Sequence, residues 1–264
     1  MARELGIDLS EVIGSGPGGA ILPSDLAGAG ASASPQGVEE QEYQVVALKG
    51  TRRTIAQRTQ QSYRTAPHIS LSIAIDAAEL WERSRRGQGG LAEQQARPPG
   101  LTSLLLKCVT AALLQHPRLN AHLVDEEIRE FQAVHLGVAV ALEEGLVVPV
   151  LRNAEQKEAL ELQSELGNLV KRAQERRLQL EEMQGSTFTV SNLGMYGINH
   201  FTSILNLPEV GILSVGAVRQ TPVAVDGEVA VRPRMNVTLN ADHRAVDGAV
   251  AAQFLQTLQE LAEH

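Results

Sequence analysis

Small and polar residues fill positions 27–42 of the chain. This stretch is rich in Ala, Gly and Ser and holds no large apolar side chain except Val38. Such a composition is typical of a flexible linker, because it offers too little apolar surface to bury. The stretch therefore divides the chain into a piece of residues 1–26, too short to hold an ordinary core, and a body of residues 43–264.

The charge and hydropathy of the chain narrow the kinds of partner. The formal net charge of -8 at pH 7 and the pI near 5.4 argue against nucleic-acid and membrane-surface partners, which usually require a basic excess. No apolar run reaches the roughly 18–20 residues that span a bilayer, and no apolar signal segment stands at the N-terminus. We therefore expect a cytoplasmic protein, or one of the mitochondrial matrix if the source is eukaryotic, with no nucleic-acid and no membrane partner.

Hydrophobic periodicity predicts a mixed α/β fold for the body. Polar and apolar residues alternate from Ile69 to Ile75, which indicates a half-buried strand, and the apolar run 101–115 indicates a buried helix. Further helices are expected at 51–65, about 160–183 and about 247–262, a loop at 86–100, and strands at 134–142, 146–151, 186–191, 210–218 and 228–239. Because helices and strands do not alternate regularly, a mixed or largely antiparallel sheet is favoured over a doubly wound nucleotide-binding fold.

Two local features are interpreted as structural. Gly14, Gly16 and Gly19 fit the dinucleotide fingerprint G-x-G-x-x-G, but no strand is predicted before them, which favours a tight turn in a small binding module. The single Cys108 lies within the apolar helical run. A buried structural thiol in a reducing compartment is therefore favoured over a nucleophile.

Two separate segments offer side chains suited to acyl transfer. His243 and Asp247 are four residues apart before the last predicted helix, and Ser191 ends a predicted strand before the Gly-rich turn 192–197. By spacing alone, Asp247 is better explained as a helix N-cap and Ser191 as part of a turn. A metal-binding pair is another alternative, although no further cluster at ligand spacing supports it. Together, a hydroxyl, a His and an Asp without a cysteine nucleophile suggest acyl transfer to a nucleophile that the substrate supplies.

The segments 185–197 and 240–248 resemble the acyltransferase component of the 2-oxo acid dehydrogenase complexes, the dihydrolipoyl acyltransferases. Residues 2–26 are similar to most of that family's peripheral-subunit-binding domain. Further segments match the family in the same order along the chain. They are Arg52–Arg58 with Ala66-Pro67-His68, His116–Ala121, Gly145–Val150 with Asn153-Ala154, Leu205–Glu209 and Gly211–Gly216. The sequence from Ser191 to Gly197 is most similar to the acetyl-transferring branch.

The resemblance implies a chloramphenicol-acetyltransferase-like mixed-sheet sandwich that works as a trimer, preceded by a truncated small helical peripheral-subunit-binding module. It implies transfer of an acetyl or similar short acyl group between dihydrolipoamide and coenzyme A, in the core of a complex for which the pyruvate dehydrogenase type is favoured. His243 is then the general base, Ser191 of the facing subunit stabilises the oxyanion, and Asp247 orients His243 or fixes its loop, for example by pairing with Arg52. No metal is expected, and the residues that bind coenzyme A stay unknown.

The sequence departs from the family pattern at four points. No lysine lies in the Asp-Lys hairpin context of a lipoyl domain, so the lipoyl group is expected from another domain or chain. Ala20 stands where the module commonly carries an arginine suited to pairing with carboxylates, which weakens the expected binding of decarboxylase and dihydrolipoyl dehydrogenase subunits through residues 2–26. The chain ends at His264 without the apolar tail of relatives, which makes a free trimer an alternative to a larger cage. Asn240 stands where the family commonly has Ser or Thr.

Two other functions stay open at this point. One is an acetyltransferase of the same fold that acts on a small hydroxylated acceptor, and the N-terminal module and the linker argue against it. The other is a non-catalytic assembly core, and the intact His243, Asp247 and Ser191 argue against it. The sequence does not determine acyl specificity beyond a preference for acetyl, because small apolar differences in a pocket discriminate weakly.

Overall fold

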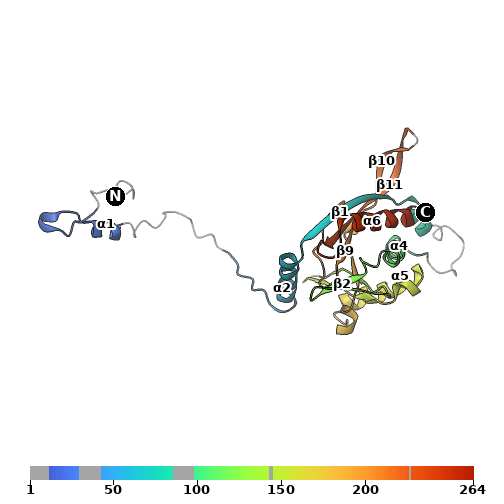
Figure 1. The fold of residues 1–264 in the computed structure, drawn as a ribbon, viewed down its shortest axis with the longest axis horizontal. Coiled ribbons are helices and arrows are strands. Elements are labelled where there is room, and N and C mark those ends of the chain that lie inside the picture. The colour runs from blue at the N-terminus through green and yellow to red at the C-terminus, as the bar shows by residue number, and fades with distance from the viewer. Residues whose placement is uncertain (1–11, 30–42, 86–97, 143–144, 226) are drawn as a thin grey trace. The chain divides into compact units, whose positions relative to one another are not determined.

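A computed structural model describes residues 12–29, 43–85, 98–142, 145–225 and 227–264. The chain divides into two compact units, residues 1–47 and residues 48–264, and each is described by itself (Figure 1). Most of the predicted linker and of the predicted loop at 86–100 lies outside the described residues.

The smaller unit is organised around one aspartate. A 3-10 turn, η2 (Pro17–Gly19), precedes helix α1 (Pro23–Ala29). The Asp25 carboxylate accepts hydrogen bonds from the Ser15 N–H (2.9 Å), the Ser15 hydroxyl (2.7 Å) and the Leu22 N–H (2.8 Å), and these bonds lower its pKa. The glycine-rich segment therefore closes a tight turn before a helix, as predicted, and no strand precedes it among the described residues.

A seven-stranded mixed sheet forms the centre of the larger unit (Figure 1). The strand order is β1-β11-β9-β8-β4-β7, and β10 pairs with β11. The pairs β4–β8 and β8–β9 are parallel and the others are antiparallel, which confirms the predicted mixed sheet. The strands of this sheet are β1 (His68–Asp76), β4 (Leu136–Val138), β7 (Val150–Leu151), β8 (Phe188–Asn192), β9 (Gly211–Val215), β10 (Arg219–Val225) and β11 (Glu228–Asp242). Two separate hairpins consist of β2 (Ala121–Val124) with β3 (Glu127–Glu130) and β5 (Val140–Leu142) with β6 (Gly145–Val147).

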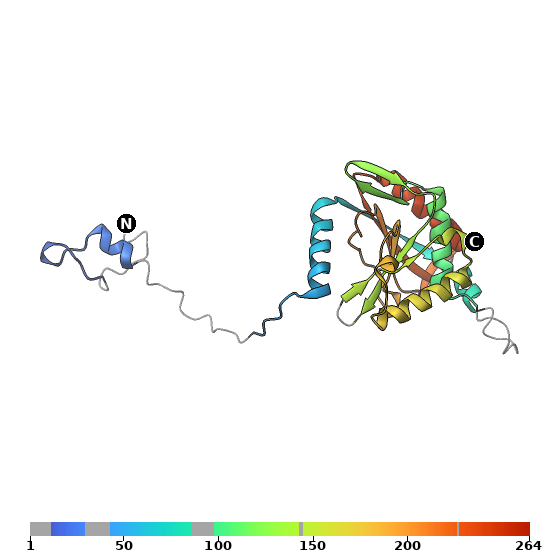
Figure 2. The same cartoon turned by 90° about the horizontal axis from the view of Figure 1, so that it is seen from below.

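Helix α6 packs against β1 and β11, α4 packs against α6 and α5, and α2 stands at one edge of the larger unit (Figure 2). The helices are α2 (Gly50–Thr65), α3 (Ala78–Arg85), α4 (Leu101–Gln115), α5 (Ala159–Gln174) and α6 (Gly248–Glu263), with 3-10 turns η3 (Ala154–Gln156), η4 (Leu180–Met183) and η5 (Gly194–Tyr196). The predicted helices at 51–65, 101–115 and 247–262 are confirmed within one residue. None of the described helices has the length and apolarity that a membrane span requires.

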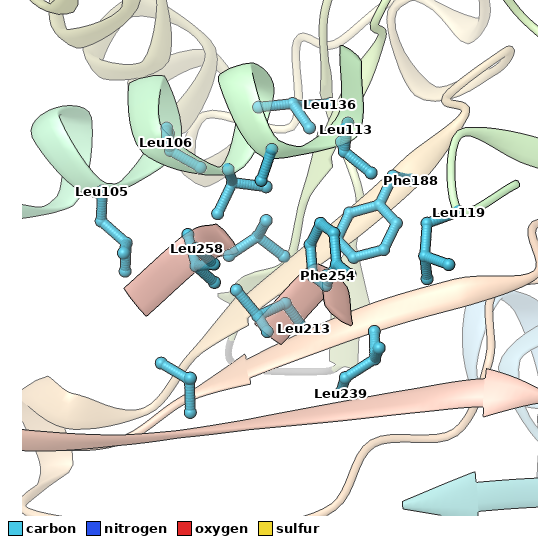
Figure 3. Close-up of a cluster of buried hydrophobic side chains, with 14 of the residues drawn as sticks. Leu105, Leu106, Leu113, Leu119, Leu136, Phe188, Leu213, Leu239, Phe254 and Leu258 are labelled. Atoms are coloured by element: carbon cyan, nitrogen blue, oxygen red, sulfur yellow. The ribbon is translucent and has the colours of Figure 1, made fainter. Parts of the chain in front are cut away.

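The core lies between the sheet and helices α4 and α6 (Figure 3). Leu213 and Leu239 point into it from β9 and β11, because alternate residues of a strand face the same side. The rings of Phe188 and Phe254 are both fully buried, with centroids 5.8 Å apart. Burial of side chains of this size contributes about 1.5–3 kcal/mol each, so they hold α6 against the sheet. The opposite face of the same strands carries the polar residues Thr189, Ser191, Ser214, Thr238 and Asn240.

The prediction of one helix over 160–183 is wrong in its last third. Helix α5 ends at Gln174, and Arg176 adopts a left-handed conformation with φ 56°. The Arg177 N–H then donates to the Arg172 carbonyl oxygen (2.8 Å), a bond typical of a Schellman helix end. Charged and apolar residues keep a helical spacing beyond this point, and no Gly or Pro marks the stop, so periodicity alone could not reveal it.

Short elements also escaped prediction. The helix α3, the hairpin β2–β3 and the strand β10 were not expected, because segments of four to eight residues carry little periodicity. Helix α1 runs to Ala29 and so includes the first three residues of the predicted linker, since alanine favours helix even in a segment of linker composition.

Cys108 of α4 is partly buried, and its thiol donates a hydrogen bond to the Leu261 carbonyl oxygen (3.3 Å). Burial raises the pKa of this thiol to about 11. A thiol with such a pKa is a poor nucleophile at neutral pH, which agrees with the structural role predicted for it.

Candidate active site

His243 is the first residue after β11, on the loop that leads into α6. Its backbone N–H donates to the Pro67 carbonyl oxygen (2.9 Å), which ties the loop to the residue that precedes β1. The side chain is exposed, and its imidazole has no hydrogen-bond partner among the described residues. An exposed imidazole on an anchored backbone is suited to exchange a proton with an incoming group.

The two neighbours of His243 form an ion pair with each other. Asp242 is fully buried, and the Arg244 guanidinium approaches its carboxylate with Nη2–Oδ2 at 2.6 Å and Nε–Oδ1 at 2.9 Å. Hydrogen bonding to Asp242 raises the pKa of Arg244 above its usual value. In the sequence, both residues lie in the segment 240–248, where no role is predicted for them. Their opposite charges on either side of a histidine are the signal that could have identified them.

Asp247 is the N-cap residue of α6, as its spacing before an apolar helix predicts, but its side chain makes no capping hydrogen bond. The carboxylate is exposed, and within the described part of the chain it pairs neither with His243 nor with Arg52. The described residues contain no group of three His, Cys, Asp or Glu side chains that could hold a metal ion. Asp247 thus lies on the His243 loop with its carboxylate open to another group.

Ser191 lies far from His243 within one chain. In the sheet register, Ser191 of β8 pairs with Ser214 of β9, which pairs with Thr238 of β11. His243 is two strands away from Ser191 and five residues further along β11, which corresponds to roughly 19 Å between Cα atoms at about 4.8 Å per strand and 3.3 Å per residue. A serine and a histidine side chain cannot bridge that distance, so one chain does not bring these two predicted site residues together.

A second histidine, His68, holds the loop of residues 193–210 against the start of β1. Its Nδ1 lies 2.7 Å from the Ala66 carbonyl oxygen, and its Nε2 accepts the Leu205 N–H at 3.1 Å. Nδ1 therefore carries the proton, because the carbonyl oxygen can only accept and the amide can only donate. In the sequence His68 is one landmark among several, since a single histidine at a strand end gives no sign of this role.

Asn240 connects the same loop to the sheet. It is almost fully buried, its Oδ1 accepts the Ser203 N–H (3.2 Å), and its Nδ2 donates to the Ser70 hydroxyl (2.7 Å). The Asn240 amide thus bonds to the loop on one side and to β1 on the other. A Ser or Thr side chain at this position is shorter and would reach less far toward both partners. This link assigns Asn240 a structural role that the sequence did not reveal.

A cavity of about 310 Å³ is lined in part by Asn192, the residue that follows Ser191. The Asn192 Nδ2 donates to the Thr102 hydroxyl (3.4 Å), and its Oδ1 accepts the Gly194 N–H (2.8 Å). Most of the other lining side chains are apolar, among them Trp81, Leu101, Leu105, Met195, Val218 and Met235. The volume of the cavity lies at the lower end of the range of small-molecule pockets.

Comparison with known families accounts for nearly the whole chain. The profile described as 2-oxoacid dehydrogenases acyltransferase (catalytic domain) matches residues 40–264, and the profile described as e3 binding domain matches residues 1–27. The dihydrolipoyllysine-residue acetyltransferase component of the acetoin cleaving system of Bacillus subtilis is 38% identical over 268 residues, which cover 100% of this chain and 67% of that protein. The chain spans about two thirds of the length of the curated relatives that it matches.

Solved structures agree with these matches. The dihydrolipoamide acetyltransferase of Azotobacter vinelandii, in which the role of a serine, a histidine and an asparagine in the catalytic mechanism was investigated, has a TM-score of 0.78 and 34% identity, covering 84% of this chain and 92% of that one. The cubic core of the pyruvate dehydrogenase multienzyme complex has a TM-score of 0.79 and 33% identity, covering 86% of this chain and 93% of that one.

A chloramphenicol acetyltransferase shares the fold at a TM-score of 0.50 and 13% identity, covering 83% of this chain and 99% of that one. The predicted chloramphenicol-acetyltransferase-like fold is thereby confirmed. The strand order, the helices on the sheet and the profile match over residues 40–264 all lead to one assignment. The chain belongs to the 2-oxoacid dehydrogenase acyltransferase family.

Proposed function

We propose that this chain is the catalytic part of a dihydrolipoyl acyltransferase that moves an acetyl or similar short acyl group between dihydrolipoamide and coenzyme A. Both substrates are thiols, so the reaction exchanges one thioester for another and needs no nucleophile from the protein. The Bacillus subtilis and Azotobacter vinelandii relatives named above are acetyltransferases, which supports acetyl as the group transferred. The pyruvate dehydrogenase type of complex is favoured because the cubic core that this chain resembles belongs to that complex.

The observation that carries the proposal is the spacing of three residues. The serine and histidine investigated in the Azotobacter vinelandii enzyme are 52 residues apart, and its asparagine follows the histidine by four. Ser191, His243 and Asp247 have the same order and the same two spacings in this chain. Asp247 stands in place of the asparagine. Both an amide and a carboxylate can orient a neighbouring group by hydrogen bonding.

The residues then act in one sequence of proton transfers and of bond formation and cleavage at the carbonyl carbon. A thiol with a pKa of about 8.5 is only a few per cent ionised at pH 7, so His243 takes its proton while the sulfur attacks the thioester carbonyl, an assistance of roughly 10²–10⁴-fold. The Ser191 hydroxyl donates to the oxyanion that forms, which contributes roughly 10²–10³-fold. Collapse of this intermediate breaks the old carbon–sulfur bond, and His243 returns the proton to the departing thiolate. Asp247 has a positioning role on the His243 loop.

The separation of Ser191 and His243 supports an active site that is shared between two copies of the chain. Because the two side chains are too far apart within one copy, the proposal pairs Ser191 of one subunit with His243 of the next. A cyclic trimer provides three such sites with one kind of interface. Assembly of trimers into a larger cage has a precedent in the cubic core that this chain resembles.

The division of labour along the chain forms part of the proposal. Residues 43–264 are the catalytic domain, 27–42 a linker, and 1–26 a partial peripheral-subunit-binding domain, which the e3 binding profile at residues 1–27 supports. This module is a candidate to bind the dihydrolipoyl dehydrogenase and decarboxylase subunits, although Ala20 removes one cation from it. The lipoyl group would come from another domain or chain, in the cytoplasm or the mitochondrial matrix.

The proposal is tested by mixing the protein with acetyl-coenzyme A and dihydrolipoamide and following S-acetyl-dihydrolipoamide by mass spectrometry. We expect turnover by the wild-type protein and a loss of roughly 10²–10⁴-fold in kcat for His243→Ala. His200→Ala is the control, because its imidazole contacts Ser72 and lies outside the proposed site.

Three outcomes would overturn parts of the proposal. A folded oligomer without turnover would favour a non-catalytic assembly core. Turnover only with a small hydroxylated acceptor would favour the other acetyltransferase function. Full activity of His243→Ala would show that His243 is not the general base. The oligomeric state is measured separately by sedimentation, which distinguishes a trimer from a cage.

A further inference from the structure

The loop that carries His243 is anchored on both sides of this residue. The Asp242 N–H donates to the Val210 carbonyl oxygen, and the Asp242 carbonyl oxygen accepts the N–H groups of Ala245 and Val246, all at 2.9 Å. Ala245 and Val246 are themselves buried. The backbone before His243 and the backbone two residues after it are therefore held by the core of the protein.

A further connection across His243 is made through the Asp242 side chain. The Asp242 carboxylate accepts the Arg244 backbone N–H at 3.1 Å, Nε at 2.9 Å and Nη2 at 2.6 Å. These bonds close a ring that includes the backbone of His243. The planar guanidinium fork gives this ring a defined geometry, which a single-point contact would not.

The pair is not an ordinary surface ion pair. Only 1% of the Asp242 side chain is exposed, whereas 46% of the Arg244 side chain is exposed. A carboxylate buried this completely loses its hydration, and an apolar residue of similar size would often serve stability as well. Stability alone therefore gives a weak reason for an Asp and an Arg at these positions, and their placement around His243 gives a stronger one.

We propose that Asp242 and Arg244 are positioning residues that fix the backbone of His243 and so aim its imidazole at the thiol substrate. The proposal rests on the function proposed above, in which His243 is the base. Neither residue touches the substrate in this scheme. Because His243 has no side-chain partner among the described residues, the direction of its ring depends on the backbone that carries it.

The expected consequence is a loss of rate rather than of substrate binding. A displacement of a catalytic group by about 1 Å can cost roughly 10²-fold in rate. We expect Arg244→Met to lower kcat by roughly 10²-fold while both KM values change by less than about twofold, because the acyl and thiol sites are untouched. Arg244→Lys keeps the charge but loses the fork, and we expect an intermediate loss of about tenfold.

Arg118 provides a matched control. Its Nε lies 2.7 Å from Glu130 Oε1, and 46% of its side chain is exposed, the same fraction as for Arg244. Arg118→Met therefore removes a similar Arg–carboxylate pair at a place remote from His243 in the sequence. We expect it to leave kcat within about twofold of the wild type, since isolated exposed pairs contribute little.

Two further measurements separate positioning from general stability. Added guanidinium ion is expected to restore part of the kcat of Arg244→Ala, because it can occupy the vacated place beside Asp242. The ring signals of His243 in protein labelled with ¹³C-histidine, identified by their loss in His243→Gln, are expected to broaden or split in Arg244→Met and not in Arg118→Met. This spectrum reports the order of His243 without any catalysis.

The outcomes distinguish this inference from the function on which it rests. If the wild type has no transferase activity but the His243 signals still depend on Arg244, the proposed function fails and the loop anchoring stands. If the wild type is active while folded Arg244→Met and Arg244→Lys keep its kcat and its His243 signals, the positioning role is refuted. An equal loss of kcat in Arg118→Met would also refute it.

Discussion

At the scale of single residues, two buried carboxyl groups meet opposite surroundings. Asp242 has an arginine partner. Glu209 is fully buried, and its side-chain donors within the described part of the chain are all neutral: the hydroxyls of Ser186 and Thr189 and the amide of Asn206. Burial raises the pKa of Glu209 from its usual 4.5 to about 7, and the three hydrogen bonds offset only part of this effect. Glu209 therefore changes its charge within the physiological pH range.

Glu209 predicts a pH dependence of stability. A raised pKa in the folded state means that the stabilising contribution is fully present below pH 4.5 and is lost as the pH rises through about 7. We expect the free energy of unfolding of the wild type, relative to Glu209→Gln, to fall by on the order of 3 kcal/mol across this window, because the amide cannot ionise. Urea unfolding at fixed protein concentration from pH 5 to 8 measures the difference. Parallel curves for the two proteins would contradict the prediction.

At the scale of elements, two glycines lie in opposite environments. Gly167 is exposed within α5, and a Cβ added there would meet no atom within 4 Å. Gly211 begins β9, and a Cβ there would lie 2.7 Å from Cε2 of Phe188, which the core holds in place. Replacement of glycine by alanine therefore changes mainly the backbone entropy at Gly167 and mainly the packing at Gly211.

Alanine at these two positions should shift stability in opposite directions. Gly167→Ala is expected to raise the free energy of unfolding by about 0.5–1 kcal/mol, the usual difference between glycine and alanine inside a helix. Gly211→Ala is expected to lower it by about 1–3 kcal/mol, because the core must shift to admit the methyl group. Thermal unfolding of both variants beside the wild type is the measurement. A stabilised Gly211→Ala would show that Phe188 can move without cost.

At the scale of the whole molecule, the shared site predicts complementation between inactive variants. Ser191→Ala and His243→Ala are each expected to have little activity as pure oligomers. When equal amounts are unfolded and refolded together, about a quarter of the interfaces will combine an intact Ser191 with an intact His243, so about a quarter of the wild-type activity should return. Mixing without refolding is the control. A refolded mixture that is as inactive as the two parent variants would show that Ser191 and His243 do not belong to the same intersubunit site.

Much of this protein follows from local patterns in the sequence. The three helices at 51–65, 101–115 and 247–262, the mixed sheet and the segments 185–197 and 240–248 are recognisable because burial imposes a period on neighbouring residues and chemistry imposes a spacing. The end of α5 was not recognisable, because a left-handed arginine and two backbone hydrogen bonds replace the usual glycine.

The relative positions of the candidate site residues follow from the folded chain and not from local patterns. Motifs along the chain were enough to predict the family, the fold class and the choice of Ser191, His243 and Asp247 as candidates. The pairing of β8 with β9 and of β9 with β11 determined that Ser191 and His243 lie too far apart to meet in one chain, and the folded loop determined that Arg244 turns back onto buried Asp242. Both results depend on contacts between segments or on side-chain direction, which periodicity along the chain does not encode.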